Sequence, residues 1–231
     1  MVGDSDSTST VNENQSGADD SVLMTIFDKS LIAANKLVDS RVIRMRARYP
    51  DATPEQLVRK LETTFLSSVI AMGAATGGAA AVRGAGTAVV LTTAAGDTSW
   101  FLTASAGHVL SVLRFHGIDI TDLEHQKAIV VMVLAGGGGG STFTGKAAGR
   151  TGAHLGKLFT SAVPLNTIRS INRVVGPNFV TKWGTEQGIL VLGKAIPFGV
   201  GMVIGAGGNL LFAKVVVTAT RKAVSTALNV E

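Results

Sequence analysis

Residues 53–81 read TPEQLVRKLETTFLSSVIAMGAATGGAAA, and this stretch decides the fold class. It opens with a complete helix start: Thr53 fits the N-cap, Pro54 the first helical position, and Gln56 the third position of a capping box. Apolar residues then follow at helical spacing: Leu57, Leu61, Phe65, Leu66 and Ile70. The pattern predicts a long helix that continues into the Ala- and Gly-rich block at 71–81.

Helical patterns recur on both sides of this stretch. They predict helices over 21–48, 98–116, a segment ending at 134, 164–175, 178–194 and 197–222. Asp97 is the expected N-cap of the 98–116 helix and Gly117 its C′ residue, while Thr121 or Asp122 is expected to cap the helix that ends at 134. Residues 84–96 fit a helix or a strand. We therefore expect an all-α fold: a single helical bundle domain over 21–231, rich in Gly and Ala.

Residues 1–20 have a different composition from the rest of the chain. They are mostly Ser, Thr, Asp, Asn and Gly, and they contain no Lys or Arg. Such a segment cannot bury enough apolar surface to offset the entropy of ordering, so we expect a disordered acidic tail. All 21 basic residues and 11 of the 16 acidic ones follow it, which gives residues 21–231 a formal charge of +10.

Three arginines near the end of the predicted 21–48 helix form the candidate contact with an anionic surface. Arg41, Arg44 and Arg48 share one helical face, where they suit both the helix dipole and anionic lipid headgroups. A solvated helix end is the alternative interpretation. Nucleic-acid binding calls for aromatic residues among the basic ones, and the neighbourhood has only Tyr49. We expect membrane lipid or a membrane protein as the partner, and no nucleic acid.

Two charge-free runs, 63–82 and 195–213, approach the length that spans a bilayer. Both are rich in glycine, and the second contains Pro197 and Asn209, so peripheral contact is expected rather than spanning. Glycines four residues apart let helices approach closely. The two glycine pairs, Gly73 with Gly77 and Gly201 with Gly205, are therefore predicted to lie at contacts between helices.

A near-match to a phosphate-binding loop supports a nucleotide-binding alternative. Residues 129–134 could form a strand, and Gly140, Gly145 and Lys146 then follow at the spacing of that motif. Ala147, however, stands where the motif needs Ser or Thr for magnesium, and no matching acidic strand follows. We therefore expect no nucleotide hydrolysis.

No other set of residues makes a catalytic or metal site. The chain has no cysteine and four histidines (His108, His116, His125 and His154), and their spacing suits packing better than metal ligation. No nucleophile motif is present, so we expect no catalytic residue, metal or cofactor. The first twenty residues lack the pattern of a secretory signal, which favours the cytoplasm.

Several segments together resemble the EcsC protein family. They are spread over most of the chain: 41–46, 73–79, 117–119, 134–137 and 194–201. The last, KAIPFGVG, is the most specific, since a glycine-rich helix with Asn209 and then the basic pair Arg221 and Lys222 follow it. The acidic tail and the five glycines at 136–140 depart from the family pattern.

The resemblance implies a helical bacterial protein and supplies no activity or cofactor. We expect a non-enzymatic, membrane-associated scaffold or accessory protein, cytoplasmic and peripheral on the inner face of the cell membrane. A soluble lipid-binding bundle with an apolar cavity, and a nucleotide-binding protein using the loop at 140–146, are the alternatives.

Overall fold

The structure, a computed structural model, describes the backbone of residues 7–80, 87–134 and 200–228. Side-chain surroundings are described for 25–76, 96–134 and 209–228. These residues form five helices and no strand: α1 (Ser7–Arg48), α2 (Pro54–Ala80), α3 (Thr87–Phe115), α4 (Leu123–Leu134) and α7 (Val200–Leu228). The predicted all-α fold is confirmed for this part of the chain. The helices predicted over 164–175 and 178–194 lie outside it.

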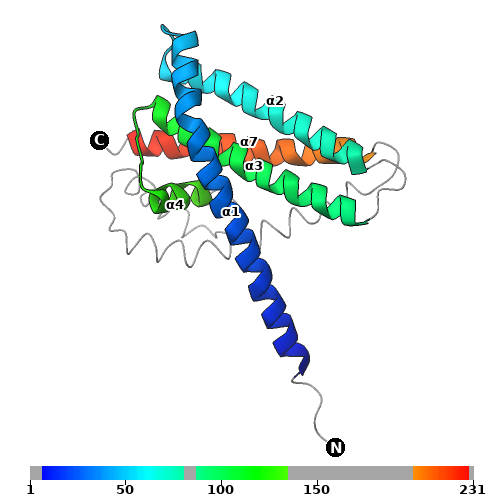
Figure 1. The fold of residues 1–231 in the computed structure, drawn as a ribbon. Coiled ribbons are helices and arrows are strands. Elements are labelled where there is room, and N and C mark those ends of the chain that lie inside the picture. The colour runs from blue at the N-terminus through cyan, green and yellow to red at the C-terminus, as the bar shows by residue number, and fades with distance from the viewer. Residues whose placement is uncertain (1–6, 81–86, 135–199, 229–231) are drawn as a thin grey trace, which may run out of the picture.

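Three of the helices lie side by side and α1 crosses them. α2 packs along α7 and against α3, while α1 lies across α3 and its N-terminal half extends beyond the bundle (Figure 1). The short α4 contacts α3 and α7. This arrangement leaves one side of α1 without a neighbour among the described helices.

All five helices contribute buried side chains to the core, and those of α7 are alanines and valines. The largest fully buried side chains lie on α1, α2, α3 and α4: Phe27, Leu31, Val69, His108, Val109, Val112, Leu113, Ile129, Val130 and Val133. Small side chains let the helices approach, and burial of the aliphatic ones supplies the main stabilisation, at about 25 cal/mol per Å² of apolar surface. One buried member, His108, is polar.

The helix ends follow the predicted capping rules. The backbone N–H of Thr53 donates to Oε1 of Gln56 at 3.0 Å, and the N–H of Gln56 lies 3.4 Å from Oγ1 of Thr53. These two contacts form the reciprocal capping box expected at the start of α2. At the start of α4, the Asp122 carboxylate accepts from the backbone N–H of His125 at 2.9 Å, which confirms Asp122 as the N-cap.

Gly117 ends α3 as predicted. Its φ is 77°, in the left-handed region that glycine adopts most easily. The N–H of Gly117 donates to the carbonyl of Arg114 at 3.2 Å, and the N–H of Ile118 donates to that of Leu113 at 3.0 Å. This pair of bonds is the Schellman motif, which satisfies the last carbonyls of the helix and turns the chain toward α4.

Asp97 is not the N-cap that its sequence position suggested. α3 begins ten residues earlier, at Thr87, so Asp97 lies inside the helix, and residues 87–96 are helical rather than a strand. The Asp97 side chain is buried, with its Oδ2 atom 3.4 Å from Nδ2 of Asn209 on α7. The carboxylate therefore serves an interhelical contact instead of capping backbone N–H groups.

Two further segments can be compared with the predictions made from the sequence. α1 begins at Ser7 and so takes in residues 7–20, where the composition predicted disorder. The backbone hydrogen-bond pattern of the helix predicted over 21–48 continues through these residues, so α1 is longer than predicted. Residues 129–134 belong to α4, which confirms the helix predicted to end at 134, and they do not form the strand that the nucleotide-binding alternative required.

An ion pair between a buried glutamate and an exposed arginine joins α2 to α7. Glu62 is 5% exposed, and its carboxylate accepts from Nε of Arg221 at 2.6 Å and also from Nη2 of the same arginine. The hydrogen bond that Arg221 donates to the Glu62 carboxylate raises the pKa of Arg221 above its ordinary value. Within the described helices, none combines the length and hydropathy required to cross a membrane.

The glycine at the end of α3 gives a direct test of the helix termination. A Cβ added at Gly117 would touch nothing within 4 Å, so Gly117→Ala changes only the backbone strain. We expect it to lower the free energy of unfolding by about 1–2 kcal/mol, measured by urea denaturation. Gly96 is the matched control, since a Cβ there also has open space but the residue lies inside α3.

Gly96→Ala should raise the free energy of unfolding by up to about 1 kcal/mol, because alanine favours a helix interior. The same sign of change for both substitutions would contradict the assigned end of α3.

Candidate functional site

The side of α1 that faces away from the bundle combines aliphatic and basic side chains. Ile32, Leu37 and Ile43 are 45%, 50% and 67% exposed, which is unusual for residues of this size. Exposed basic residues lie among them at helical spacing. We call this surface the outer face of α1; it consists of Lys29, Ile32, Lys36, Leu37, Ile43 and Arg44.

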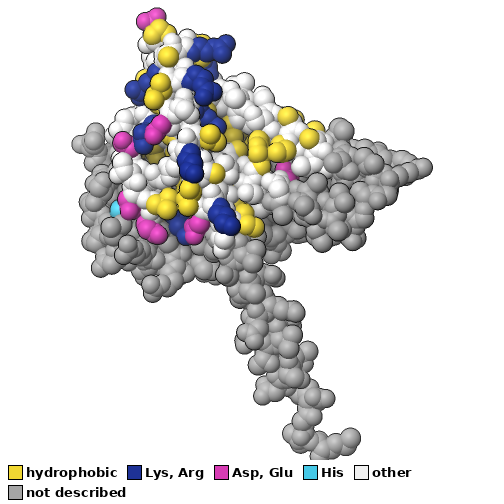
Figure 2. Space-filling model, in the orientation of Figure 1, with side chains coloured by type: hydrophobic (Ala, Val, Ile, Leu, Met, Phe, Trp, Pro, Cys, Tyr) yellow, Lys and Arg dark blue, Asp and Glu magenta, His cyan; other side chains and the backbone are white. Residues whose placement is uncertain are grey.

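The two carboxylates of α1 between residues 25 and 48 lie on its flank instead. Asp28 accepts from Nζ of Lys127 on α4 at 2.5 Å, and Asp39 accepts from Nη1 of Arg114 on α3 at 2.8 Å. Arg114 also binds Asp119 through Nε at 2.9 Å. Both acids are ion-paired with neighbouring helices, although their side chains stay 45% and 64% exposed, and none of the six residues of the outer face is acidic. Figure 2 shows basic, hydrophobic and acidic side chains together on the face over which α1 lies.

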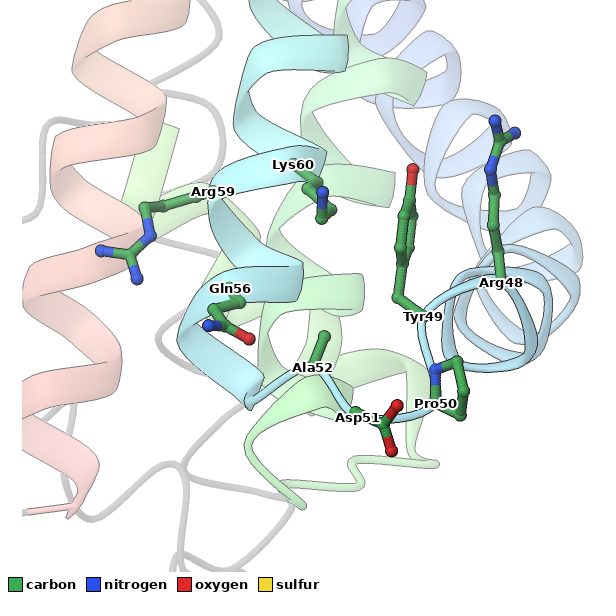
Figure 3. A pocket seen from close by; sticks show the side chains of 8 residues that line it. All are labelled: Arg48, Tyr49, Pro50, Asp51, Ala52, Gln56, Arg59 and Lys60. Atoms are coloured by element: carbon green, nitrogen blue, oxygen red, sulfur yellow. The ribbon is translucent and has the colours of Figure 1, made fainter.

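An open hollow of about 620 Å³ lies where α1 ends and α2 begins. It is formed by the end of α1, the connecting turn and the first turns of α2. Its lining residues are Arg48, Tyr49, Pro50, Asp51, Ala52, Gln56, Arg59 and Lys60 (Figure 3). We call it the corner hollow.

An aromatic ring separates two cations in the corner hollow. Nζ of Lys60 lies 4.2 Å from the centroid of the Tyr49 ring, and Cζ of Arg48 lies 5.8 Å from it. Figure 3 shows the ring standing between these two side chains, with the guanidinium of Arg59 pointing to the other side of α2. Cation–π attraction favours both placements.

Two carboxylates reduce the positive charge at this corner. Asp51 lines the hollow, and Glu55 lies in the first turn of α2. The Glu55 carboxylate accepts from Oγ1 of Thr53 at 2.7 Å, and this hydrogen bond lowers the pKa of Glu55. Glu55 is therefore held at the helix N-terminus, where its charge is favourable.

The structure separates the three predicted arginines. Arg44 and Arg48 are exposed, but Arg41 is half-buried, and its Nη1 atom lies 3.2 Å from the position a Cβ on Gly107 of α3 would occupy. Burial, followed by repulsion from Arg44, lowers the pKa of Arg41. A small residue on α3 leaves room for the Arg41 guanidinium at the α1–α3 contact, and the contact of Arg41 with an anionic surface stays a prediction.

The other predicted site residues are placed only in part. Gly73 is buried on α2. Gly77, Gly201 and Gly205 lie in helices, but outside the residues whose surroundings the structure describes. Gly140, Gly145 and Lys146 lie outside the described chain altogether, and the helix over 129–134 replaces the strand that would precede a phosphate-binding loop.

The prediction from sequence missed Lys29, Lys36 and Lys60 as parts of this surface. A helical projection of 21–48 would have found the first two, because they recur at the spacing of Ile32 and Ile43. Lys60 could not be found in this way, since its place beside Tyr49 depends on the angle between α1 and α2. That angle is set by the turn at 49–53, where the N–H of Ala52 donates to the carbonyl of Tyr49 at 3.2 Å.

His108 is the unusual polar residue of the core. It is 0% exposed and stacks on Phe65, with ring centroids 4.7 Å apart and an interplanar angle of 19°. Within the described residues, neither of its ring nitrogens has a hydrogen-bond partner, and neither has Oγ of Ser105. Burial, together with the charges of Arg41 and Arg221, lowers the pKa of His108 to about 3. At neutral pH the ring is therefore uncharged and packs as an aromatic side chain.

The described residues contain no cluster of three or more His, Cys, Asp or Glu side chains that could hold a metal ion. Comparisons of the chain with family models, with curated proteins and with solved structures found no match. The surface along α1 and the corner hollow are thus the features from which a function is inferred.

The lowered pKa of His108 predicts how the free energy of unfolding changes at acidic pH. An unfolded histidine binds a proton below about pH 6.5, whereas folded His108 binds one only near pH 3. Over this window the unfolded state holds more protons, so the free energy of unfolding falls as the pH falls. At about 1.4 kcal/mol per pKa unit, His108 contributes a loss of several kcal/mol across the window.

His108→Phe keeps the stacked ring and removes the titration. We expect a less steep acid loss than in the wild type, and equal or higher stability at pH 7, because an unpaired buried polar group is removed. Urea denaturation at a series of pH values measures both. His116→Gln is the control, since His116 is only half-buried. If the free energy of unfolding of His108→Phe falls with decreasing pH as steeply as that of the wild type, the lowered pKa of His108 is not the cause of the acid sensitivity.

Proposed function

We propose that this protein is a non-enzymatic, membrane-associated scaffold or accessory protein of the EcsC-like type, peripheral on the cytoplasmic face of the cell membrane. The observation that carries the proposal is the outer face of α1. It places Ile32, Leu37 and Ile43 among basic residues, while both nearby carboxylates are paired on the flank. A helix with this distribution suits the boundary between headgroups and acyl chains.

The expected strength of this contact follows from two contributions. Each basic residue near an anionic surface is worth about 1 kcal/mol, so Lys29, Lys36 and Arg44 give a binding that salt weakens. The three aliphatic side chains add a hydrophobic contribution that salt does not screen. Together they favour reversible peripheral binding, which agrees with the lack of a spanning helix in the described part of the chain.

The same surface is less suited to nucleic acid. Single-stranded nucleic acid binds through bases stacked on exposed aromatic rings. The Tyr49 ring at the basic corner already has Lys60 over it, and Trp100 is packed against the core on another helix. We therefore retain membrane lipid, or a membrane protein with an acidic surface, as the partner.

Vesicle co-sedimentation with phosphatidylglycerol tests the proposal. The double variant Lys36→Glu/Arg44→Glu reverses two charges on the outer face, and we expect at least about tenfold weaker binding, from about 1 kcal/mol or more per basic residue. Ile43→Asp should also weaken binding, through loss of apolar contact. Binding of the wild type should fall as salt concentration rises.

Lys214→Glu/Lys222→Glu is the matched control, because it makes the same change of net charge at exposed positions on α7. It should retain most of the binding. Equal losses in the two double variants would show that only net charge matters, and a wild type that never sediments with anionic vesicles would overturn the proposed function.

A further inference from the structure

We infer that the exposed side of α7 is a second contact for an anionic membrane, so that one copy of the protein holds two membrane surfaces together. The inference rests on the proposed function, which supplies the first membrane at the outer face of α1. We call the exposed side of α7 the back face. It consists of six exposed residues: Leu211, Lys214, Val215, Thr218, Lys222 and Ser225.

Two aliphatic side chains protrude from the back face. Leu211 is 68% exposed and Val215 is 44% exposed, and the two residues lie four positions apart, on the same side of the helix. A convex helix surface from which aliphatic side chains protrude suits the boundary of a bilayer, into which these side chains insert. A protein partner would instead need a groove of matching shape.

The charge of the back face is entirely positive. Lys214 and Lys222 are exposed on it, and the sequence of α7, Val200–Leu228, contains no aspartate or glutamate. Arg221, the remaining basic residue of α7, is bound by Glu62 of α2. Two exposed lysines on a helix without a carboxylate favour an anionic surface as the partner. The back face thus combines basic and aliphatic residues in the same way as the outer face of α1.

The two faces point in opposite directions. Both α1 and α7 pack against α3, and within the described residues they share no extended contact with each other. Figure 1 shows α1 passing in front of α3 and α7 running behind it. The outer face of α1 is turned away from α3, and the back face is turned away from α2 and α3, which α7 contacts through its buried side. A single flat bilayer therefore cannot meet both faces of one copy.

The back face is the weaker of the two contacts. It has two basic residues, whereas the outer face of α1 has three. Copies held on one membrane by α1 present many back faces to the next membrane at once, and linked contacts of this kind raise the overall affinity by about a hundredfold or more. We therefore expect bridging where one membrane is already covered by the protein.

Clustering of large phosphatidylglycerol vesicles by the full chain, followed by light scattering, tests the inference. The wild type should cluster the vesicles. Lys214→Glu/Lys222→Glu should retain most of its co-sedimentation but cluster vesicles at least about tenfold more slowly, because each lysine at an anionic surface is worth about fivefold in affinity. Leu211→Asp should have the same selective effect through loss of apolar contact. Thermal unfolding of each variant checks the fold.

Arg59→Glu/Lys60→Glu is the matched control for clustering. It makes the same change of net charge at exposed positions on α2, outside both faces. Because salt screens charges that are not in contact with the membrane, this variant should cluster vesicles within about twofold of the wild-type rate.

Capture of a second vesicle identifies what the back face holds. Immobilised phosphatidylglycerol vesicles, coated with protein and washed, should capture added phosphatidylglycerol vesicles but not phosphatidylcholine ones. Equal capture of the two, or capture only when the added vesicles also carry protein, would overturn the inference, and the second result would show bridging by pairs of copies.

The proposed function and this inference fail in different ways. Co-sedimentation of the wild type without clustering, or clustering that survives in Lys214→Glu/Lys222→Glu, would overturn the inference while the proposed function stands. A wild type that does not sediment with anionic vesicles would overturn both.

Discussion

The close crossing of α1 over α3 is the constraint on which the other features depend. At Gly107 an added Cβ would lie 3.9 Å from Cβ of Ala34 and 3.2 Å from Nη1 of Arg41, so the two helices meet through a glycine and an alanine. The Oγ atom of Ser30 donates to the carbonyl of Ser99 at 3.2 Å, and Asp39 binds Arg114 at 2.8 Å, on either side of this contact. Because α3 covers the inner side of α1 and no other described helix lies on the opposite side, the proposed contact is assigned to that side.

The crossing also determines which charged residues of α1 can reach partners on other helices. Residues on the flank can reach α3 and α4, and that is where Asp28 and Asp39 find their partners Lys127 and Arg114. The carboxylates of these pairs are 45% and 64% exposed, so each pair adds little to stability. Their consequence is electrostatic: they neutralise the carboxylates and leave Lys29, Lys36 and Arg44 unopposed on the outer face. The outer face of α1 is therefore basic, although the sequence of this helix contains both acidic and basic residues.

Sequence predicted the elements whose signals are local. The capping box of Thr53 and Gln56, the Asp122 cap and Gly117 each depend on residues a few positions apart, and the structure confirms all three. Side-chain positions that depend on contacts between helices could not be predicted from the sequence. Asp97 has the residue type of an N-cap, but Asn209, on another helix, lies within 3.4 Å of its carboxylate. Arg41 shares a helical face with Arg44 and Arg48, but its guanidinium lies next to Gly107 of α3, where the lack of a side chain leaves room for it. In the same way, the meeting of Tyr49 and Lys60 depends on the turn that joins two helices.

Arg41 connects the buried layer of the bundle with its surface. Its guanidinium lies against α3 beside Gly107, and its charge helps to hold the pKa of His108 far below the ordinary value. A histidine that stays neutral, with no partner for its nitrogens among the described residues, cannot exchange protons near pH 7 and contributes only packing to the core. Close packing of such side chains holds the backbone of the described helices in place. Cations carried by a backbone that is already fixed would meet an anionic partner without a further loss of backbone entropy, which favours the contact proposed for the outer face of α1.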